Sequence, residues 1–297
     1  MGNVKKGIIM LFSAYFMWGV LPIYWKALAS LGSIEILAHR ILWSAAASLI
    51  YTLCKGRWHL VTDFIRNRKI AALKLMAGGV LISFNWWLYI WAVNDGRILE
   101  TSRGYFINPL VSMMFGMFCF SEKLSRLQYG AVVLVFLGVG VEIVSAGKIP
   151  FVSLGLAFSF GFYSVLKKTV SIDPMAGLLI ETLTVTPPAL LWLIHLQTSG
   201  LASFPYSAST TLLLAGTGII TTIPLALFAV AMRYVPLTTV GFVQYLSPSI
   251  TFIIGNFIYH ETMAPSRLAS FAFIWAALGL YTFNAAVNKS PNQAKTS

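Results

Sequence analysis

Charged residues are scarce in this chain. They make up 10% of its 297 residues, whereas an ordinary globular domain carries about a quarter. Residues of the hydrophobic set make up 58%. This composition excludes a disordered chain, and a water-soluble fold would have to expose large apolar patches, which soluble monomers rarely do. The sequence therefore predicts a protein whose main solvent is the lipid bilayer.

Cysteine and the common catalytic motifs are equally sparse. The two cysteines, Cys54 and Cys119, lie far apart and form no C-x-x-C pair, which argues against a disulfide framework and a zinc site. The chain has no H-E-x-x-H, no G-x-S-x-G and no G-x-x-x-x-G-K-[ST] motif. We therefore expect no metal, no cofactor, no catalytic residue and no nucleotide-driven step.

Long apolar runs supply the predicted fold. A helix that crosses the hydrocarbon core needs about 20 mostly apolar residues. Ten such runs lie roughly at 7–26, 34–54, 70–93, 98–120, 127–145, 151–168, 174–196, 210–232, 237–259 and 267–287. The first run resembles a secretory signal, but it is longer than a typical signal core and contains Pro22 and Lys26. We expect it to be retained, in an all-α integral membrane protein with ten transmembrane helices.

The basic residues are divided unevenly between the two sets of loops. The net charge is +12. With ten spans, fifteen Lys and Arg residues, including Lys167 and Lys168, fall on the side of both termini and four on the other side. Cytoplasmic loops carry the excess of Lys and Arg in membrane proteins. We therefore expect both termini in the cytoplasm, and no nucleic-acid partner.

An internal repeat divides the chain into two halves. Residues 104–109 (GYFINP) are matched by residues 241–248 (GFVQYLSP), and the proline that ends each stretch lies thirteen residues before a glutamate, Glu122 or Glu261. We expect these glutamates to make interfacial or gating contacts at opposite faces of the membrane.

The repeat sets the domain organisation. Residues 1–146 and 147–288 form two halves of five helices each, followed by a cytoplasmic tail at 289–297. Because each half holds an odd number of spans, the second half lies upside down relative to the first. Inverted repeats of this kind are typical of secondary transporters, whose substrate site lies near the midplane between the halves.

Five stretches together resemble a known family. They are 14–19 (AYFMWG), 35–40 (EILAHR), 85–86 (NW), 105–110 (YFINPL) and 156–160 (LAFSF). The combination resembles the RarD branch of the EamA group, in the drug/metabolite transporter superfamily, over nearly the whole chain. The resemblance implies ten helices in two EamA repeats, a permease in the bacterial inner membrane and a link to chloramphenicol sensitivity. Arg103 departs from the family pattern, in which this position is usually apolar.

Ionisable side chains inside a span are costly, so they usually face a cavity or a partner. Arg40 can hold a carboxylate in a bidentate fork. It could bind an anionic substrate group, pair with Glu181 in one transport state, or form a permanent structural ion pair. His39 and Glu181 could exchange protons or serve only as hydrogen-bond partners. Glu100 and Arg103 could neutralise each other one turn apart, near the outer interface.

Uncharged polar and aromatic residues complete the predicted site. Aromatic side chains could stack on a flat substrate, and polar groups beside the proline breaks could line a cavity. The alternative is that they pack between helices or anchor the chain at the interface. These candidates are Asn85, Trp86, Tyr89, Tyr105, Asn108, Tyr163, Gln244 and Tyr245.

The favoured function is a secondary active transporter that exports a small organic metabolite or drug-like molecule by alternating access, with proton coupling as its energy source. An intramembrane enzyme or a non-transporting scaffold is the alternative. The expected partners are a small-molecule substrate and the lipid bilayer. Gly138, Gly140 and Gly279 would permit close helix packing, either inside the chain or in a homodimer.

Overall fold

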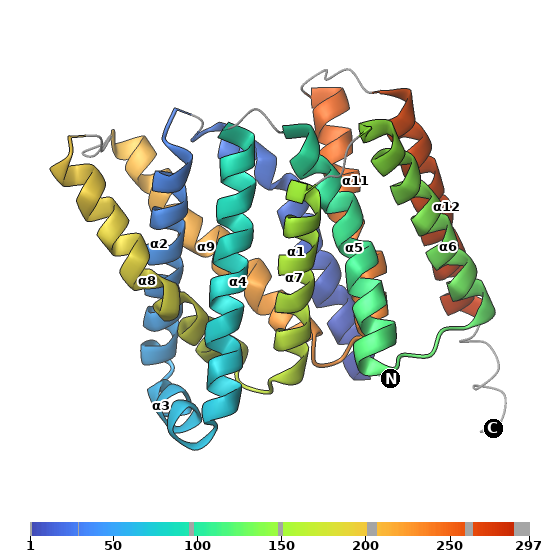
Figure 1. The fold of residues 1–297 in the computed structure, drawn as a ribbon. Coiled ribbons are helices and arrows are strands. Elements are labelled where there is room, and N and C mark those ends of the chain that lie inside the picture. The colour runs from blue at the N-terminus through green and yellow to red at the C-terminus, as the bar shows by residue number, and fades with distance from the viewer. Residues whose placement is uncertain are drawn as a thin grey trace.

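The computed structural model describes residues 2–28, 30–94, 98–147, 151–200, 207–258 and 264–287. Within them the regular elements are helices: α1 (Gly2–Lys26), α2 (Ser33–Cys54), α3 (Trp58–Asn67), α4 (Lys69–Asn94), α5 (Ile98–Phe120), α6 (Arg126–Ala146), α7 (Phe151–Thr169), α8 (Pro174–Thr198), α9 (Ala208–Ala231), α10 (Leu237–Gln244), α11 (Leu246–Ile253), the π-helical turn η1 (Ile254–Ile258) and α12 (Pro265–Val287). α1 begins and α12 ends at the same end of the bundle (Figure 1).

Most of the predicted spans are long and apolar enough to cross a membrane. Among the described residues, eight segments meet this criterion: α1, α2, α4, α6, α8, α9, the stretch from α10 to η1, and α12. Residues Gly104–Phe120 of α5 form a shorter apolar helix. The prediction of an all-helical membrane protein is confirmed, and the count of ten spans depends on α5 and α7.

α7 is less apolar because much of it faces protein rather than lipid. It packs against α4 and α5, and its buried positions include Ser153, Ser159, Ser164 and Lys167. A helix surrounded by other helices does not need a lipid-compatible surface all round, so hydropathy alone understates its place in the bundle.

The short helix α3 was not predicted. It has ten residues, too few to cross the hydrocarbon core. Its apolar side, with Val61 and Phe64, packs against residues of α4 and α8. It lies at the end of the bundle where α1 begins (Figure 1). A search for long apolar runs passes over a helix of this kind.

The predicted span at 237–259 is found as Leu237–Ile258, but it is not one continuous helix, because the chain changes helix at Tyr245, between α10 and α11. The repeat explains the difference. Five residue steps separate Gly104 from Pro109 in the continuous helix α5, whereas seven separate Gly241 from Pro248. The two additional residues of the second half coincide with this break.

Helix contacts follow the repeat. α1, α2, α4, α5 and α6 correspond in chain order to α7, α8, α9, α10–α11 and α12. α2 packs on α8, α5 on α10 and α6 on α12, so three pairs of counterparts meet directly. In addition, α4 contacts α7 and α8 while its counterpart α9 contacts α1 and α2. This reciprocity is expected of two similar halves related by a two-fold axis.

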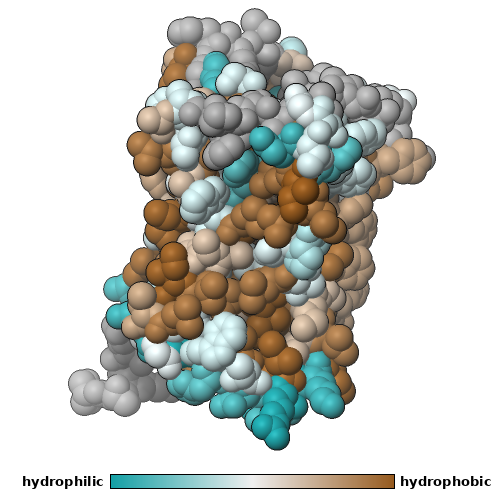
Figure 2. All heavy atoms as spheres, turned by 90° about the vertical axis from the view of Figure 1, so that its left-hand side faces the viewer, coloured by the Kyte–Doolittle hydropathy of each residue, from teal (hydrophilic) through white to brown (hydrophobic). Residues whose placement is uncertain are grey.

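The outside of the bundle is apolar. Large hydrophobic side chains are exposed along α8 and α9, among them Leu191, Ile194, Leu212 and Ile219. On the flank seen in Figure 2, apolar side chains cover the middle of the face and hydrophilic ones gather at its lower end. Such a band is too extensive for a soluble monomer and suits a lipid environment.

The three predicted packing glycines have different surroundings. Ser270 Oγ of α12 donates a hydrogen bond to Gly138 O at 2.6 Å, and a Cβ atom at Gly138 would lie 3.0 Å from Ser270 O. Gly138 therefore serves packing between α6 and α12. A Cβ atom at Gly140 or Gly279 would meet nothing within 4 Å, so only these two could belong to a dimer surface.

Candidate functional site

Arg40 lies where helices from both halves meet. It projects from α2, and its Nε donates a hydrogen bond to Thr221 Oγ1 of α9 at 2.8 Å. Its guanidinium carbon lies 3.8 Å from the ring centroid of Trp86 on α4 and 5.2 Å from that of Trp25 on α1. Tyr105 on α5 is close enough to interact electrostatically with it. Three predicted site residues, Arg40, Trp86 and Tyr105, are thus brought together.

Arg40 has no carboxylate partner among the residues that the structure describes. Its side chain is only half-buried. Among the described residues, ion pairs join Arg57 to Asp173, Lys167 to Glu181, Lys168 to Glu122 and Arg267 to Glu142. The predicted pairing of Arg40 with Glu181 is therefore absent from this conformation, in which Glu181 binds another cation.

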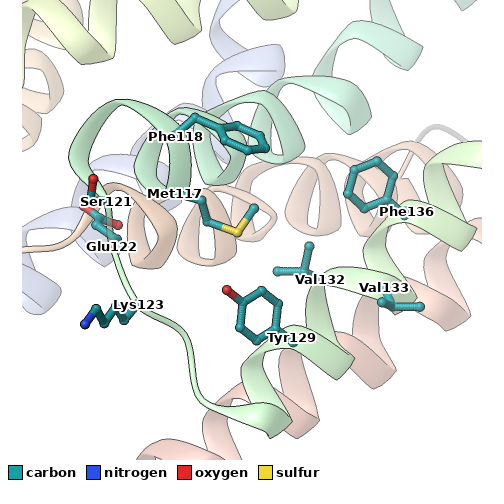
Figure 3. Close-up of a pocket in the computed structure, with 9 residues that line it drawn as sticks. All are labelled: Met117, Phe118, Ser121, Glu122, Lys123, Tyr129, Val132, Val133 and Phe136. Carbon is teal, nitrogen blue, oxygen red and sulfur yellow. The ribbon is translucent and has the colours of Figure 1, made fainter.

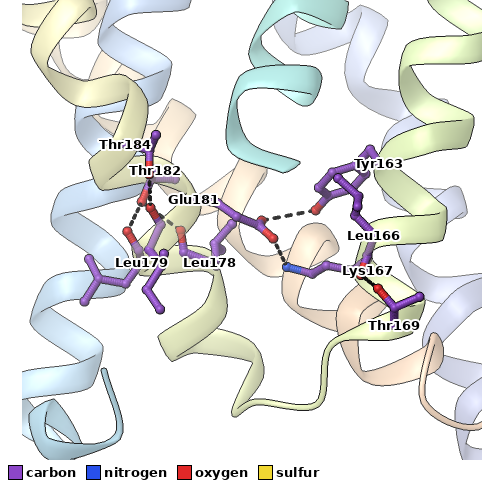
Figure 4. Close-up of polar contacts among 10 residues, drawn as sticks. Tyr163, Leu166, Lys167, Thr169, Leu178, Leu179, Glu181, Thr182 and Thr184 are labelled. Atoms are coloured by element: carbon purple, nitrogen blue, oxygen red, sulfur yellow. Dashed lines mark hydrogen bonds and ion pairs between the residues drawn. The ribbon is translucent and has the colours of Figure 1, made fainter. Parts of the chain in front are cut away.

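Glu181 forms a buried polar cluster with two residues of α7 (Figure 4). Lys167 Nζ lies 2.5 Å from Glu181 Oε1, and Tyr163 Oη donates a hydrogen bond to Glu181 Oε2 at 3.3 Å. The side chains of Lys167 and Glu181 are 6% and 2% exposed. Both charges are desolvated, and each is compensated by the other.

Small residues on α4 leave room for this cluster. A Cβ atom at Gly79 would overlap the backbone oxygen of Glu181, so only glycine permits this approach of α4 to α8. On the other side, Tyr163 stacks on Phe228 with ring centroids 6.1 Å apart. The buried hydroxyl of Tyr15 has no hydrogen-bond partner in the described part of the chain, although Tyr15 is close enough to interact electrostatically with Tyr163.

Lys167 is the residue of this cluster that the sequence analysis missed. Its place near the end of a predicted span put it among the cytoplasmic loop charges, but it is buried. Glu142, four residues before the end of α6, was overlooked as well; it is 3% exposed, and one of its oxygens lies 3.6 Å from Arg267 Nη2. A useful signal for Lys167 was its spacing of four residues from Tyr163, which places both on one helix face.

Glu122 joins the two halves. From the loop after α5, its carboxylate accepts hydrogen bonds from Leu237 N at 2.6 Å, Thr238 N at 2.8 Å and Thr238 Oγ1 at 2.8 Å. These are free amides at the start of α10, where a negative charge is favourable. Lys168 Nζ lies 3.8 Å from the same carboxylate. A Cβ atom at Gly116 would lie 2.7 Å from Glu122 Oε2, so this contact also requires a glycine.

Two predicted site residues hold helices together at the border of α4. Asn85 Nδ2 donates hydrogen bonds to Leu156 O and Ser159 Oγ of α7, each at 2.8 Å. Asn85 therefore fixes α4 to α7. Tyr89 packs against Tyr105 with ring centroids 5.8 Å apart, which places it beside the surroundings of Arg40.

The predicted residues near the proline breaks link α5 to α10. Ser112 Oγ donates a hydrogen bond to Gln244 Oε1 at 3.2 Å, and Tyr245 Oη donates one to Phe106 O at 2.8 Å. Both contacts are buried and connect the two halves. Asn108 is also buried, and its Oδ1 has no hydrogen-bond partner among the described residues.

The remaining ionisable candidates are less informative. His39, half-buried on α2, interacts electrostatically with Glu35 one turn earlier. The side chains of Glu100 and Arg103 lie outside the described residues, as does Glu261. Their predicted roles stay predictions.

A pocket of about 500 Å³ lies between the end of α5 and α6 (Figure 3). Several of its side chains are strongly exposed, including Phe118 and Val133, so it opens on the outer surface of the bundle. Its lining consists of Met117, Phe118, Ser121, Glu122, Lys123, Tyr129, Val132, Val133 and Phe136. None of the predicted site residues is among them, and we place the candidate site around Arg40 instead.

Comparisons with known proteins agree with the two-fold organisation. The model of the EamA-like transporter family matches the chain twice, over residues 5–143 and 148–283. The chain is 44% identical to "Uncharacterized transporter YojE" of Bacillus subtilis, with 95% of each chain covered. It is 41% identical to "Protein RarD" of Streptomyces exfoliatus, covering 95% of this chain and 89% of that one. A solved structure titled "Crystal structure of protein" has the same fold, with a TM-score of 0.72, 16% identity, and 94% and 98% of the two chains covered.

The buried pair yields a prediction about stability. Lys167→Met leaves Glu181 buried without its cation, and breaking such a pair costs about 3–5 kcal/mol. We expect a clear fall in the unfolding temperature of the detergent-solubilised protein, and recovery of most of it in the double variant Lys167→Met with Glu181→Gln.

The matched control is Arg57→Met, which breaks an ion pair with Asp173 whose arginine side chain is 42% exposed. Exposed pairs contribute about 0–1 kcal/mol, so this variant should unfold close to the wild type. An equal effect of Lys167→Met and Arg57→Met would show that the buried pair does not stabilise the bundle.

Proposed function

This chain belongs to the EamA-like transporter family, as the resemblance to its RarD branch predicted, and we propose that it carries a small organic molecule across the bacterial inner membrane by alternating access. The family and the apolar helices identify a multi-pass membrane protein. The observation that carries the proposal is Arg40, a cation without a carboxylate partner in the described residues, which is contacted from both halves.

Alternating access requires two halves that can move against each other around one site. We propose that all ten long segments, including α5 and α7, span the membrane, and that the halves have inverted topology. The reciprocal helix contacts support this arrangement. The bonds of Glu122 to the start of α10 join the two halves at one end of the bundle. We expect them to break when that end opens.

The proposed orientation places both termini in the cytoplasm. The start of α1 and the end of α12 at one end of the bundle support it (Figure 1), as does the excess of Lys and Arg in the loops on that side. Reporter domains fused to each terminus should both report a cytoplasmic location. A periplasmic signal from the C-terminal fusion would contradict the ten-span topology.

The proposed direction is export. We expect overexpression of the protein to raise the extracellular level of one or more small metabolites, and deletion of its gene to lower it, as measured by untargeted mass spectrometry of cells and medium. Arg40→Ala should abolish the effect while the protein still inserts in the membrane fraction. Arg57→Ala, which removes an arginine outside the site, should behave as wild type. Chloramphenicol susceptibility of the same strains tests the link that the resemblance implies.

The same measurement separates the alternatives. A transporter moves compounds between cell and medium and leaves their total nearly unchanged. An intramembrane enzyme would instead convert one compound into another, so a precursor would fall as its product rises. A non-transporting scaffold would change neither, and unchanged metabolite profiles in all strains would overturn the proposed transport.

We propose Glu181 as the proton-coupling group. Its carboxyl lies inside the bundle with Lys167 and Tyr163 as direct partners and Tyr15 nearby, so protonation would replace the ion pair with a hydrogen bond from the Lys167 ammonium to a neutral carboxyl and leave the cluster with one net positive charge. Glu181→Gln mimics the protonated form. In inverted membrane vesicles supplied with the exported compound, this variant should transport without responding to an imposed pH gradient.

Glu142→Gln is the matched control for this prediction, because Glu142 is another buried carboxylate with a basic partner, Arg267. It should retain the wild-type response to the gradient. An unchanged response in Glu181→Gln would remove Glu181 from the coupling mechanism.

A further inference from the structure

Arg40 is neutralised in a different way from three other buried or half-buried cations of the bundle, which are Lys167, Lys168 and Arg267. Lys167 is paired with Glu181, and Arg267 lies 3.6 Å from a carboxylate oxygen of Glu142. Arg40 instead contacts the hydroxyl of Thr221 and the rings of Trp25 and Trp86. The chain places a carboxylate beside Lys167 and another beside Arg267. Because no carboxylate of the described residues lies beside Arg40, its charge points to a negative group that is supplied by a ligand.

The surroundings of the guanidinium leave one of its edges open. Trp86 covers its face at 3.8 Å, and Nε is occupied by Thr221. No hydrogen bond to a described residue occupies Nη1 or Nη2. The two terminal nitrogens of an arginine present parallel N–H groups, which fit the two oxygens of a carboxylate.

From this geometry we propose that Arg40 binds a single carboxylate group, so that the substrate of the proposed transport is a small organic acid. The inference rests on the proposed function and adds the chemical class of the substrate. A neutral compound would not compensate the positive charge of Arg40. A phosphate dianion would bring a second negative charge, for which the described part of the site holds no second cation.

The neighbours of Arg40 also indicate the body of the acid. Trp25 and Trp86 are half-buried and Tyr105 is 45% exposed, so their rings are accessible beside the open edge of the guanidinium. Aromatic side chains supply apolar contact area for flat groups. A carboxylate attached to an aromatic or other flat apolar group would use both features.

Binding by the purified full-length protein in lipid nanodiscs tests this inference without an assay of transport. The probes are benzoate and indole-3-acetate, each compared with its primary amide, which has nearly the same shape and no charge. Isothermal titration calorimetry gives the affinities. We expect each acid to bind about tenfold or more tightly than its amide, the effect of one charge-assisted hydrogen-bonded contact.

Variants of Arg40 test whether this residue causes the difference in affinity between each acid and its amide. Arg40→Gln should reduce the affinity for the acids to that for the amides, and Arg40→Lys should restore part of the difference, because lysine keeps the charge but loses the planar fork. Arg57→Gln removes an arginine outside the site and should bind as wild type. Equal affinities for acid and amide, no binding of either acid to the wild type, or unchanged acid binding by Arg40→Gln would each overturn the inference. Phenyl phosphate binding more tightly than benzoate would do so as well.

The metabolite comparison separates the two proposals. If the exported compounds lack an acidic group, transport is confirmed and the carboxylate inference fails. If the acids bind through Arg40 but no metabolite is redistributed in cells, the anion site is confirmed and the proposed transport fails.

Discussion

The constraint on which this structure depends is the absence of water in the bilayer, which obliges each charge and each free backbone group in a span to find a partner within the protein. The Lys167 to Glu181 pair satisfies two such charges. The carboxylate of Glu122 satisfies the amides at the start of α10. These contacts determine which helices lie together, because a helix displaced from its partner would leave a desolvated charge or amide behind.

The same constraint divides the polar contacts into two groups. The Lys167 to Glu181 pair joins α7 to α8, both in the second half, and would move with that half as a unit. Contacts that cross between the halves include the ion pairs of Arg57, Lys168 and Arg267 and single neutral hydrogen bonds, as between Ser112 and Gln244 and between Tyr245 and the backbone of Phe106. Such bonds contribute about 0.5–1.5 kcal/mol each. The interface between the halves also carries much of the packing of the bundle, since α2 packs on α8, α5 on α7 and α10, and α6 on α12, so relative movement of the halves must keep or replace these helix contacts.

The sequence carries much of the fold and part of the site. Apolar runs locate the long helices because lipid selects for them directly, but they say nothing of α3, which is too short to span. They also hide the break at Tyr245, which only a comparison of the two repeats reveals. Arg40 is recognisable by its position inside a span. The partners of Lys167 and Glu122 cannot be recognised in this way, because the position of a residue along the chain indicates neither how deep its side chain lies in the bundle nor which distant helix faces it.

The environment of Arg40 also explains how a half-buried cation can persist without a permanent counter-ion. An arginine at the centre of a membrane helix costs about 2.5–3.5 kcal/mol on insertion scales. A desolvated cation–π contact contributes about 2 kcal/mol, and a hydrogen bond of a charged group about 1.5–3 kcal/mol. Trp86 and Thr221 together thus roughly offset the cost. A site balanced in this way is stable when empty and still has an open edge for an anion, and because no internal carboxylate competes for that edge, an anion can bind and leave in each cycle.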